Sequence, residues 1–233
     1  NSNGAAIVIV HGGGWREGDK SQLRGYGVLL AREGFVCLCT SYRLSEDEKW
    51  PAQIQDVKCA VRYIRANADL LNIDPNRIGI SGNSAGGHLS LMAGLREYSP
   101  KFEGEAGNND VNSSVKAVCA IYPPAQIRKY ENTDPINDAY KTLMGVEAPQ
   151  EEYDLASPLL QIRDDFPPTM LIHGSADSVV NLSDTTDLYK ILVDLNIPAE
   201  LHIYSEEEHA FDSQSGYGRS VADLQALFFQ KYL

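Results

Sequence analysis

Short apolar runs that recur along the chain are the feature that most constrains its fold. Each run is bounded by turn residues and is continuous rather than alternating, which is typical of parallel strands covered on both faces. The runs are Ala5–Val10, Phe35–Thr40, Arg77–Ile80, Val115–Tyr122, Thr169–Ile172 and Glu200–Tyr204. We therefore expect a mostly parallel sheet of about six strands.

Helical patterns lie between these runs. After Pro51, apolar residues at helical spacing are followed by similar patterns in three later segments, and these segments are Ala85–Leu95, Ser183–Asn196 and about Ser220 to Leu233. Strands that alternate with helices indicate crossover units and the α/β class, in which helices cover both faces of the sheet. With 233 residues, 43% of them hydrophobic, the chain suits a single three-layer domain over residues 1–233.

One connection is longer than a simple crossover requires. About 45 residues separate the run that ends at Tyr122 from the run that starts at Thr169, and long insertions in compact domains are usually lids or binding loops. We expect a small cap over the site at about residues 123–165, and the alternative is a helical connection with a decorative loop. A second polar stretch, Tyr98–Ser114, is expected to be a mobile surface loop.

Composition restricts the partners. The formal net charge of −12 disfavours a nucleic acid, because an acidic chain repels phosphates. No apolar run approaches the roughly 20 residues of a membrane helix, and no signal peptide is visible. No cysteine lies in a CxxC pair or near a histidine cluster, so neither a metal nor another cofactor is expected. The compartment, cytoplasmic or secreted, and a homo-oligomeric state are left open.

The stretch GISGNSAGGH, Gly79 to His88, holds the strongest chemical signal. Residues 82–86 fit the pattern G-x-S-x-G, with a strand before and a helical run after, which is the context of a nucleophile elbow. The turn is so tight that the positions two residues before and after Ser84 must lack bulky side chains. The alternative is a glycine-rich structural turn, but the context favours Ser84 as a nucleophile.

A serine hydroxyl needs a base to remove its proton. His209 lies in SEEEHAFD beyond the final run, where an imidazole can reach across the carboxyl edge of the sheet. The other histidines fit worse: we expect His11 and His173 to anchor loops, His202 to pack on a sheet face, and His88 to lie too close to Ser84 in the sequence.

An imidazole base needs an acid that fixes its tautomer. Asp177 follows the run Thr169–Ile172 in HGSADSVV, again at the carboxyl end of a strand. The carboxylates near His209, which are those of residues 206–208 and Asp212, are too close in sequence to orient its ring and are interpreted as solvated loop charges. The predicted catalytic residues are therefore Ser84, Asp177 and His209, in the chain order of hydrolases with this elbow.

Three consecutive glycines follow the first apolar run, in HGGGW. Glycines let a backbone approach a substrate closely and turn its N–H groups inward. We therefore expect an oxyanion hole formed by the N–H groups of Gly13, Gly14 and Ala85. A nucleotide-phosphate loop is disfavoured, because neither GxGxxG nor a glycine-lysine pattern is present.

These motifs together resemble the α/β-hydrolase superfamily, and most of all its feruloyl-esterase-like and hormone-sensitive-lipase-like bacterial serine esterases. The resemblance rests on HGGGW, the block from TSYRL to GNSAGGH, HGSADSVV and EEEHAFD, which occur in that order. It implies a serine carboxylesterase that hydrolyses short-chain acyl esters through an acyl-enzyme on Ser84. Acetyl or feruloyl esters of plant polysaccharides are then plausible substrates. Trp15, Tyr42 and Tyr122 are expected to line the pocket, with a core position as the alternative for each.

The chain departs from this family at two informative places. About four residues precede the first run, where the family has one or two further strands, so we expect those antiparallel strands to be absent and a sheet edge to be exposed or swapped. The sequence Tyr122-Pro123-Pro124-Ala125-Gln126 replaces a Gly-Pro-x-Asp turn, which predicts a different pocket wall. The alternative functions are arylformamide hydrolysis with the same triad and a non-enzymatic binding module.

Overall fold

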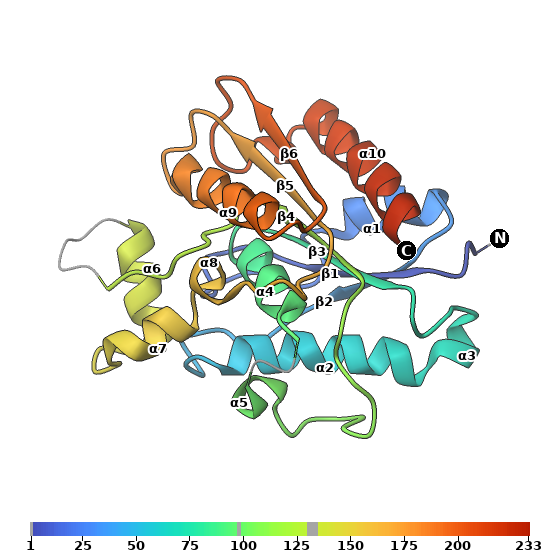
Figure 1. The fold of residues 1–233 in the computed structure, drawn as a ribbon, viewed down its shortest axis with the longest axis horizontal. Helices are drawn as coiled ribbons and strands as arrows, with labels where there is room; N and C mark the ends of the chain where they lie inside the picture. The colour runs from blue at the N-terminus through green and yellow to red at the C-terminus, as the bar shows by residue number, and fades with distance from the viewer. Residues whose placement is uncertain (1, 97–98, 130–134) are drawn as a thin grey trace.

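The sheet has six strands, all parallel, in the order β2-β1-β3-β4-β5-β6 (Figure 1). The structure is a computed structural model that describes residues 2–96, 99–129 and 135–233. The strands are β1 (Ala6–Val10), β2 (Val36–Thr40), β3 (Ile78–Asn83), β4 (Ala117–Ile121), β5 (Thr169–Gly174) and β6 (Ala199–Tyr204). The predicted sheet is confirmed. The largest difference between a predicted and an observed strand end is at β3: the predicted run ends at Ile80, whereas the strand pairs with β4 as far as Asn83.

Helices cover both faces of this sheet. On one face lie α1 (Arg24–Arg32) and α10 (Ser215–Tyr232), and on the other lie α2 (Ala52–Ala66), α4 (Ala85–Gly94) and α9 (Leu182–Asp194). A short helix, α3 (Ala68–Leu71), follows α2. Strand β1 shows why both faces need cover: Val8 and Val10 belong to one apolar cluster, and Ile7 and Ile9 to the other. The predicted three-layer α/β fold is confirmed.

Helix α1 is not among the predicted helices, because glycines at positions 25 and 27 weaken the helical signal of RGYGVLLAR. The structure gives a reason for one of them. A Cβ on Gly27 would lie 3.2 Å from the sulfur of Cys39 on β2. A small residue at position 27 therefore lets α1 pack closely on the edge strand.

The described part of the long insertion carries three helices, which lie at the left of Figure 1. They are α6 (Pro135–Met144), α7 (Gln150–Leu155) and α8 (Pro158–Gln161). Helix α6 contacts the glycine loop: the guanidinium of Arg16 lies 2.6 Å from the carboxylate of Asp138, and a Cβ on Gly14 would meet Ala139 at 3.7 Å. The cap at 123–165 stays a prediction, and residues 130–134 of it lie outside the described residues.

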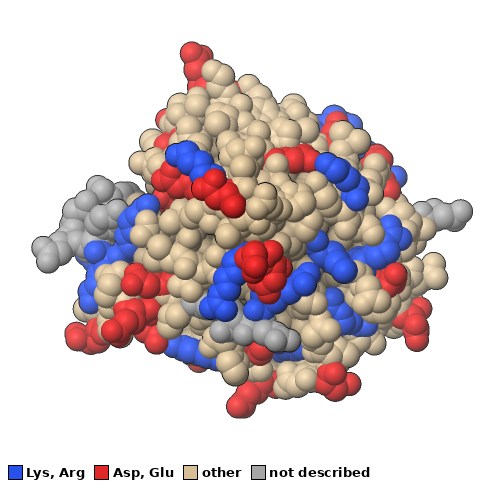
Figure 2. All heavy atoms as spheres, viewed as in Figure 1, with Lys and Arg blue, Asp and Glu red and all other residues tan. Residues whose placement is uncertain are grey.

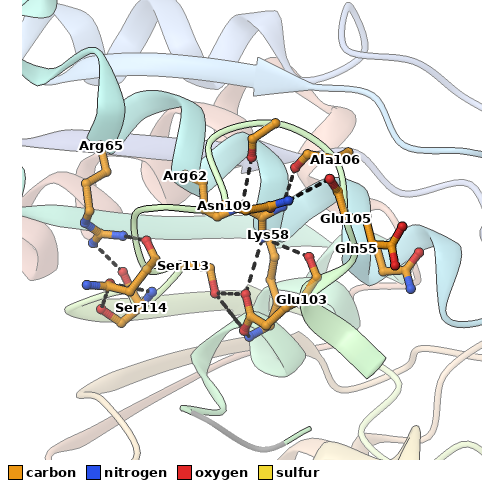
Figure 3. A network of polar contacts seen from close by, with 12 residues as sticks. Gln55, Lys58, Arg62, Arg65, Glu103, Glu105, Ala106, Asn109, Ser113 and Ser114 are labelled. Atoms are coloured by element: carbon orange, nitrogen blue, oxygen red, sulfur yellow. Dashed lines mark hydrogen bonds and ion pairs between the residues drawn. The ribbon is translucent and has the colours of Figure 1, made fainter. Parts of the chain in front are cut away.

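Basic residues of α2 anchor the segment 99–114, which includes the short helix α5 (Pro100–Glu103) (Figure 3). The Lys58 ammonium lies 2.6 Å from the Glu103 carboxylate, and Arg62 donates to carbonyls of residues 103, 106 and 107. Arg65 donates to the carbonyls of residues 112 and 114. Over its described part, the stretch expected to be a mobile loop is therefore tied to α2 by many hydrogen bonds.

Charge is mixed on the face of the molecule that Figure 2 shows. Lys and Arg side chains alternate there with Asp and Glu, so the described part of this face presents no extended basic surface of the kind that binds a phosphate backbone. In the described ranges, no helix combines the length and the apolar character needed to cross a bilayer.

Replacing Glu103 by Gln should destabilise the fold, because it leaves the buried Lys58 and Arg62 without their carboxylate. Since Glu103 itself is partly exposed, we expect a loss of about 2 kcal/mol at pH 7 in urea unfolding. Burial raises the pKa of Glu103, but Lys58, Ser113 and Arg62 lower it more, to below its ordinary value.

Because the pKa of Glu103 is lower in the folded chain, its stabilisation is present above the ordinary carboxyl pKa and is lost as the pH falls. The difference between the variant and the wild type should therefore shrink below about pH 4. The control Asp187→Asn removes an exposed pair with Lys190 and should change stability by less than about 0.5 kcal/mol. Equal stability of Glu103→Gln and the wild type at pH 7 would contradict this account.

Candidate active site

Ser84 occupies a strained turn between β3 and α4. Its backbone has φ +51° and ψ −121°, a conformation that costs a non-glycine residue about 1–3 kcal/mol. The neighbours two residues away must be glycine: a Cβ on Gly86 would lie 2.1 Å from the Val10 carbonyl oxygen, and a Cβ on Gly82 would lie 2.4 Å from the Gly86 oxygen. The turn therefore closes against the end of β1, and it requires the small residues of the motif.

The three residues predicted to be catalytic form one hydrogen-bonded chain. His209 Nε2 lies 3.0 Å from Ser84 Oγ, and His209 Nδ1 lies 2.7 Å from Asp177 Oδ2. Asp177 follows β5 and His209 follows β6, so two neighbouring strands bring them to one edge. A carboxylate can only accept, so Nδ1 carries a proton, and in the neutral ring Nε2 is then free to accept the Ser84 proton.

Asp177 is a fully buried carboxylate with four donors. Its Oδ1 accepts from the N–H groups of Val179 at 2.9 Å and Val180 at 2.8 Å, and its Oδ2 lies near both His209 and His173 Nε2, the latter at 3.1 Å. Burial raises the pKa of Asp177, but the hydrogen bonds from His173, His209 and the backbone outweigh it and hold this pKa well below its usual range. The carboxylate is therefore ionised at neutral pH.

The alternative acids considered from the sequence bind elsewhere. The Glu208 carboxylate accepts hydrogen bonds from the N–H and hydroxyl of Ser178. Asp212 accepts a hydrogen bond from Tyr26 at 2.6 Å and another from Tyr122. It is the Asp177 carboxylate that contacts the His209 ring, through Nδ1.

The glycine loop runs directly against Ser84. A Cβ on Gly12 would lie 3.3 Å from Ser84 Cβ, and a Cβ on Gly13 would lie 2.2 Å from the Glu17 carbonyl. Gly13 and Gly14 have φ of +102° and +57°, which favour glycine. Both line the same cleft as Ser84 and His209. Ala85 opens α4, where N–H groups lack an intrahelical acceptor.

Trp15 lies behind this loop in the core, not on the cleft wall where it was expected. It is fully buried, and its indole N–H donates to His88 Nδ1 at 3.2 Å. His88 Nε2 in turn donates to the Ala156 carbonyl at 2.7 Å. Burial lowers the pKa of His88 to about 4, so the ring is neutral. Trp15 and His88 together connect the glycine loop to Ala156 of the insertion.

Tyr42 also lies behind the loop and not on the cleft wall. Its ring stacks on His11 with the centroids 4.2 Å apart, and its hydroxyl contacts the carbonyl oxygens of His11 at 3.1 Å and Gly12 at 3.2 Å. Trp15 and Tyr42 are therefore positioned to hold the shape of the loop.

Tyr122 does line the cleft, and it joins three parts of the site. Its hydroxyl donates to Asp212 and accepts from the Asn83 amide at 3.0 Å, while its ring centroid lies 4.6 Å from that of His209. Asp212 and Tyr26 were not among the predicted site residues. The sequence offers little signal for them, because Asp212 lies in an acidic loop and Tyr26 in a helix without a clear pattern.

The cleft around Ser84 has a volume of about 1050 Å³. One part of its wall is apolar, with Ile136 and Ala139 of α6 and Val179 after β5. Another part is mixed, where α10 begins and α1 approaches it: the polar side chains of Gln22, Ser213, Ser215 and Arg219 lie there with those of Leu23, Tyr26 and Leu29. Ser84 thus faces a space with room for both an apolar and a polar substituent.

The fold and the arrangement of these residues define an α/β-hydrolase: a parallel sheet, a serine in a strand–turn–helix elbow, and an acid and a histidine on the loops after later strands. The comparison with known families is more specific. The sequence model of the BD-FAE family matches residues 1–192, and the chain belongs to this family.

Relatives of known class are similar over most of the chain. Esterase LipC of Mycobacterium tuberculosis is 34% identical over 75% of this chain and 44% of its own length. The probable carboxylic ester hydrolase LipM of the same organism is 31% identical over 90% of this chain and 50% of its own length. The chain therefore spans about half the length of these curated relatives.

Solved structures match the whole fold. A truncated form of a carbohydrate esterase from gut microbiota has a TM-score of 0.85 and 30% identity, over 99% of this chain and 87% of the other. An acetyl ester-xyloside bifunctional hydrolase from Caldicellulosiruptor lactoaceticus has a TM-score of 0.86 and 26% identity, over 99% and 84%.

Replacing Gly86 by Ala should destabilise the chain by about 3 kcal/mol or more, because the added methyl group meets the fixed backbone of Val10. In thermal unfolding we expect the midpoint to fall by about 10 °C. The matched control is Gly216→Ala in α10, where a Cβ meets no atom within 4 Å and stability should stay equal or rise by up to about 1 kcal/mol. An unchanged midpoint for Gly86→Ala would refute the proposed close contact.

Proposed function

We propose that this chain is a serine carboxylesterase that hydrolyses short-chain acyl esters through an acyl-enzyme on Ser84. The observation that carries the proposal is the hydrogen-bonded chain from Ser84 through His209 to the buried Asp177. Ser84 and His209 line a cleft that the glycine loop also lines. The esterase names of the relatives support the same reaction class.

The reaction follows from the positions of these groups. Ser84 Oγ attacks the ester carbonyl carbon while His209 Nε2 takes its proton, and Asp177 stabilises the imidazolium that results. His209 then returns the proton to the leaving alcohol as the acyl C–O bond breaks. Water repeats the sequence on the acyl-enzyme, releases the acid and restores Ser84.

The oxyanion formed on attack needs donors. In the proposal, the N–H groups of Gly13, Gly14 and Ala85 bind it. Preorganised donors of this kind contribute about 10²–10³ in rate each. The contacts of Trp15 and Tyr42 behind the loop support such preorganisation, because they restrict the backbone that carries the donors.

The leaving group that fits best is a sugar, so the proposed substrates are acetyl or feruloyl esters of plant polysaccharides. A cleft of about 1050 Å³ is larger than a short acyl group needs. The polar side chains near α1 and α10 are suited to hydroxyl-rich groups, and the apolar wall at α6 is suited to an acyl group. Two similar structures are named as a carbohydrate esterase and an acetyl ester-xyloside hydrolase.

Ser84→Ala should lower kcat on p-nitrophenyl acetate by about 10⁶, because the variant lacks the nucleophile. Wild-type activity should fall as the acyl chain lengthens from acetate to octanoate. The control Ser220→Ala removes an exposed hydroxyl that contacts Tyr204 and does not line the cleft, and it should keep wild-type rates. Acetylated xylooligosaccharides and feruloylated sugars then test the leaving group.

Two results would contradict this function. One is hydrolysis that survives in Ser84→Ala. The other is a wild type that leaves every ester intact but hydrolyses N-formylkynurenine, an aryl formamide, which would assign the same three residues to amide substrates.

A further inference from the structure

A second histidine, His173, contacts the same carboxylate oxygen of Asp177 as His209 does. We propose that His173 is a positioning residue for the Asp177–His209 pair, and that the hydroxyl of Thr185 holds the His173 ring in the orientation in which it can act. The inference deepens the proposed function and rests on it. It extends the hydrogen-bonded chain by two residues, to Thr185, His173, Asp177, His209 and Ser84.

The His173 ring is enclosed and has a partner on each nitrogen. It is the penultimate residue of β5 and is fully buried. Its Nε2 lies 3.1 Å from Asp177 Oδ2 and 3.1 Å from the Val180 carbonyl oxygen. Its Nδ1 lies 2.7 Å from the Thr185 hydroxyl.

The location of the proton follows from these partners. Both groups near Nε2 are oxygen acceptors, so Nε2 must carry a hydrogen, because a lone pair there would face two oxygens at 3.1 Å. In the neutral ring, Nδ1 is then an acceptor, and the Thr185 hydroxyl is its donor. Within the described part of the chain, His173 is the group to which this hydroxyl is hydrogen-bonded.

Thr185 is itself held in place. It is fully buried in the first part of α9. The neighbouring carboxylate of Asp184 accepts from the N–H groups of Ala125 and Gln126 and lies 2.8 Å from Arg128. The start of α9 is thereby tied to the segment after β4, and the hydroxyl stays directed at His173.

The consequence for the site concerns Asp177 Oδ2. This one oxygen receives His173 Nε2 and His209 Nδ1, while Oδ1 is fixed by two backbone N–H groups. His173 Nε2 contacts Oδ2 from the rigid strand β5, so it acts with the two backbone N–H groups to hold the carboxylate rotation in which Oδ2 faces His209. Without the Thr185 hydroxyl, Nδ1 is a buried acceptor that has lost its donor, and the ring is held less firmly against the carboxylate.

Two substitutions at Thr185 separate this role from packing. Thr185→Val keeps the shape and removes the donor, whereas Thr185→Ser keeps the donor and removes a methyl group. We expect Val to lower kcat by about 10-fold with KM little changed, which is the lower end of the loss caused by removing the outer hydrogen-bond partner of a metal-binding histidine. Ser should retain most of the activity. The reverse order, with Val active and Ser impaired, would overturn the inference and indicate packing alone.

A second readout needs no catalysis. In ¹⁵N-histidine-labelled wild type, two-dimensional NMR of the imidazole nitrogens should show His173 as the Nε2–H tautomer. In Thr185→Val the Nε2–H tautomer should persist, and the Nδ1 resonance should shift because this nitrogen has lost its donor. An Nδ1–H tautomer in an active wild type would overturn the inference and leave the proposed function intact. An inactive wild type with the Nε2–H tautomer would instead count against the proposed function.

Discussion

The contact between the end of β1 and the turn that holds Ser84 is the constraint on which the rest of the site depends. Gly82 and Gly86 leave no room for a Cβ beneath the turn, since the Val10 carbonyl fills that space. The same closeness sets Gly12 against Ser84 and so brings the glycine loop to the proposed nucleophile. One backbone contact between β1 and α4 therefore couples the proposed nucleophile to its proposed oxyanion donors.

The polar half of the site contains a buried carboxylate that must accept hydrogen bonds. Asp177 is enclosed in protein, and an unpaired carboxylate there would be costly. Four donors from the β5–α9 turn, from β5 and from the loop after β6 satisfy it. Because these donors come from different elements, the carboxylate also fixes how the loops lie. Stability and the proposed proton transfer therefore depend on the same hydrogen bonds.

The sequence predicts the parts of this structure that depend on local pattern. Continuous apolar runs identify the strands, and the glycines around Ser84 identify the turn because its sterics are local. Side-chain direction is harder to predict: Trp15 has φ +59° and turns into the core, which its neighbours do not reveal. Tyr122 binds Asp212 from 90 residues away, and Lys58 pairs with Glu103 from 45 residues away. Such pairings follow from the packing of helices and loops on the sheet, which no short motif encodes.

Reaction with diethyl p-nitrophenyl phosphate, followed by intact mass spectrometry and peptide mapping, is the most direct test of the central claim. This reagent phosphorylates an activated serine and releases one nitrophenol for each serine modified. We expect one diethylphosphoryl group per chain, located on Ser84, and we expect a His209→Ala variant to react far more slowly. A folded wild type that stays unlabelled, or that carries the label on another residue, would contradict the account.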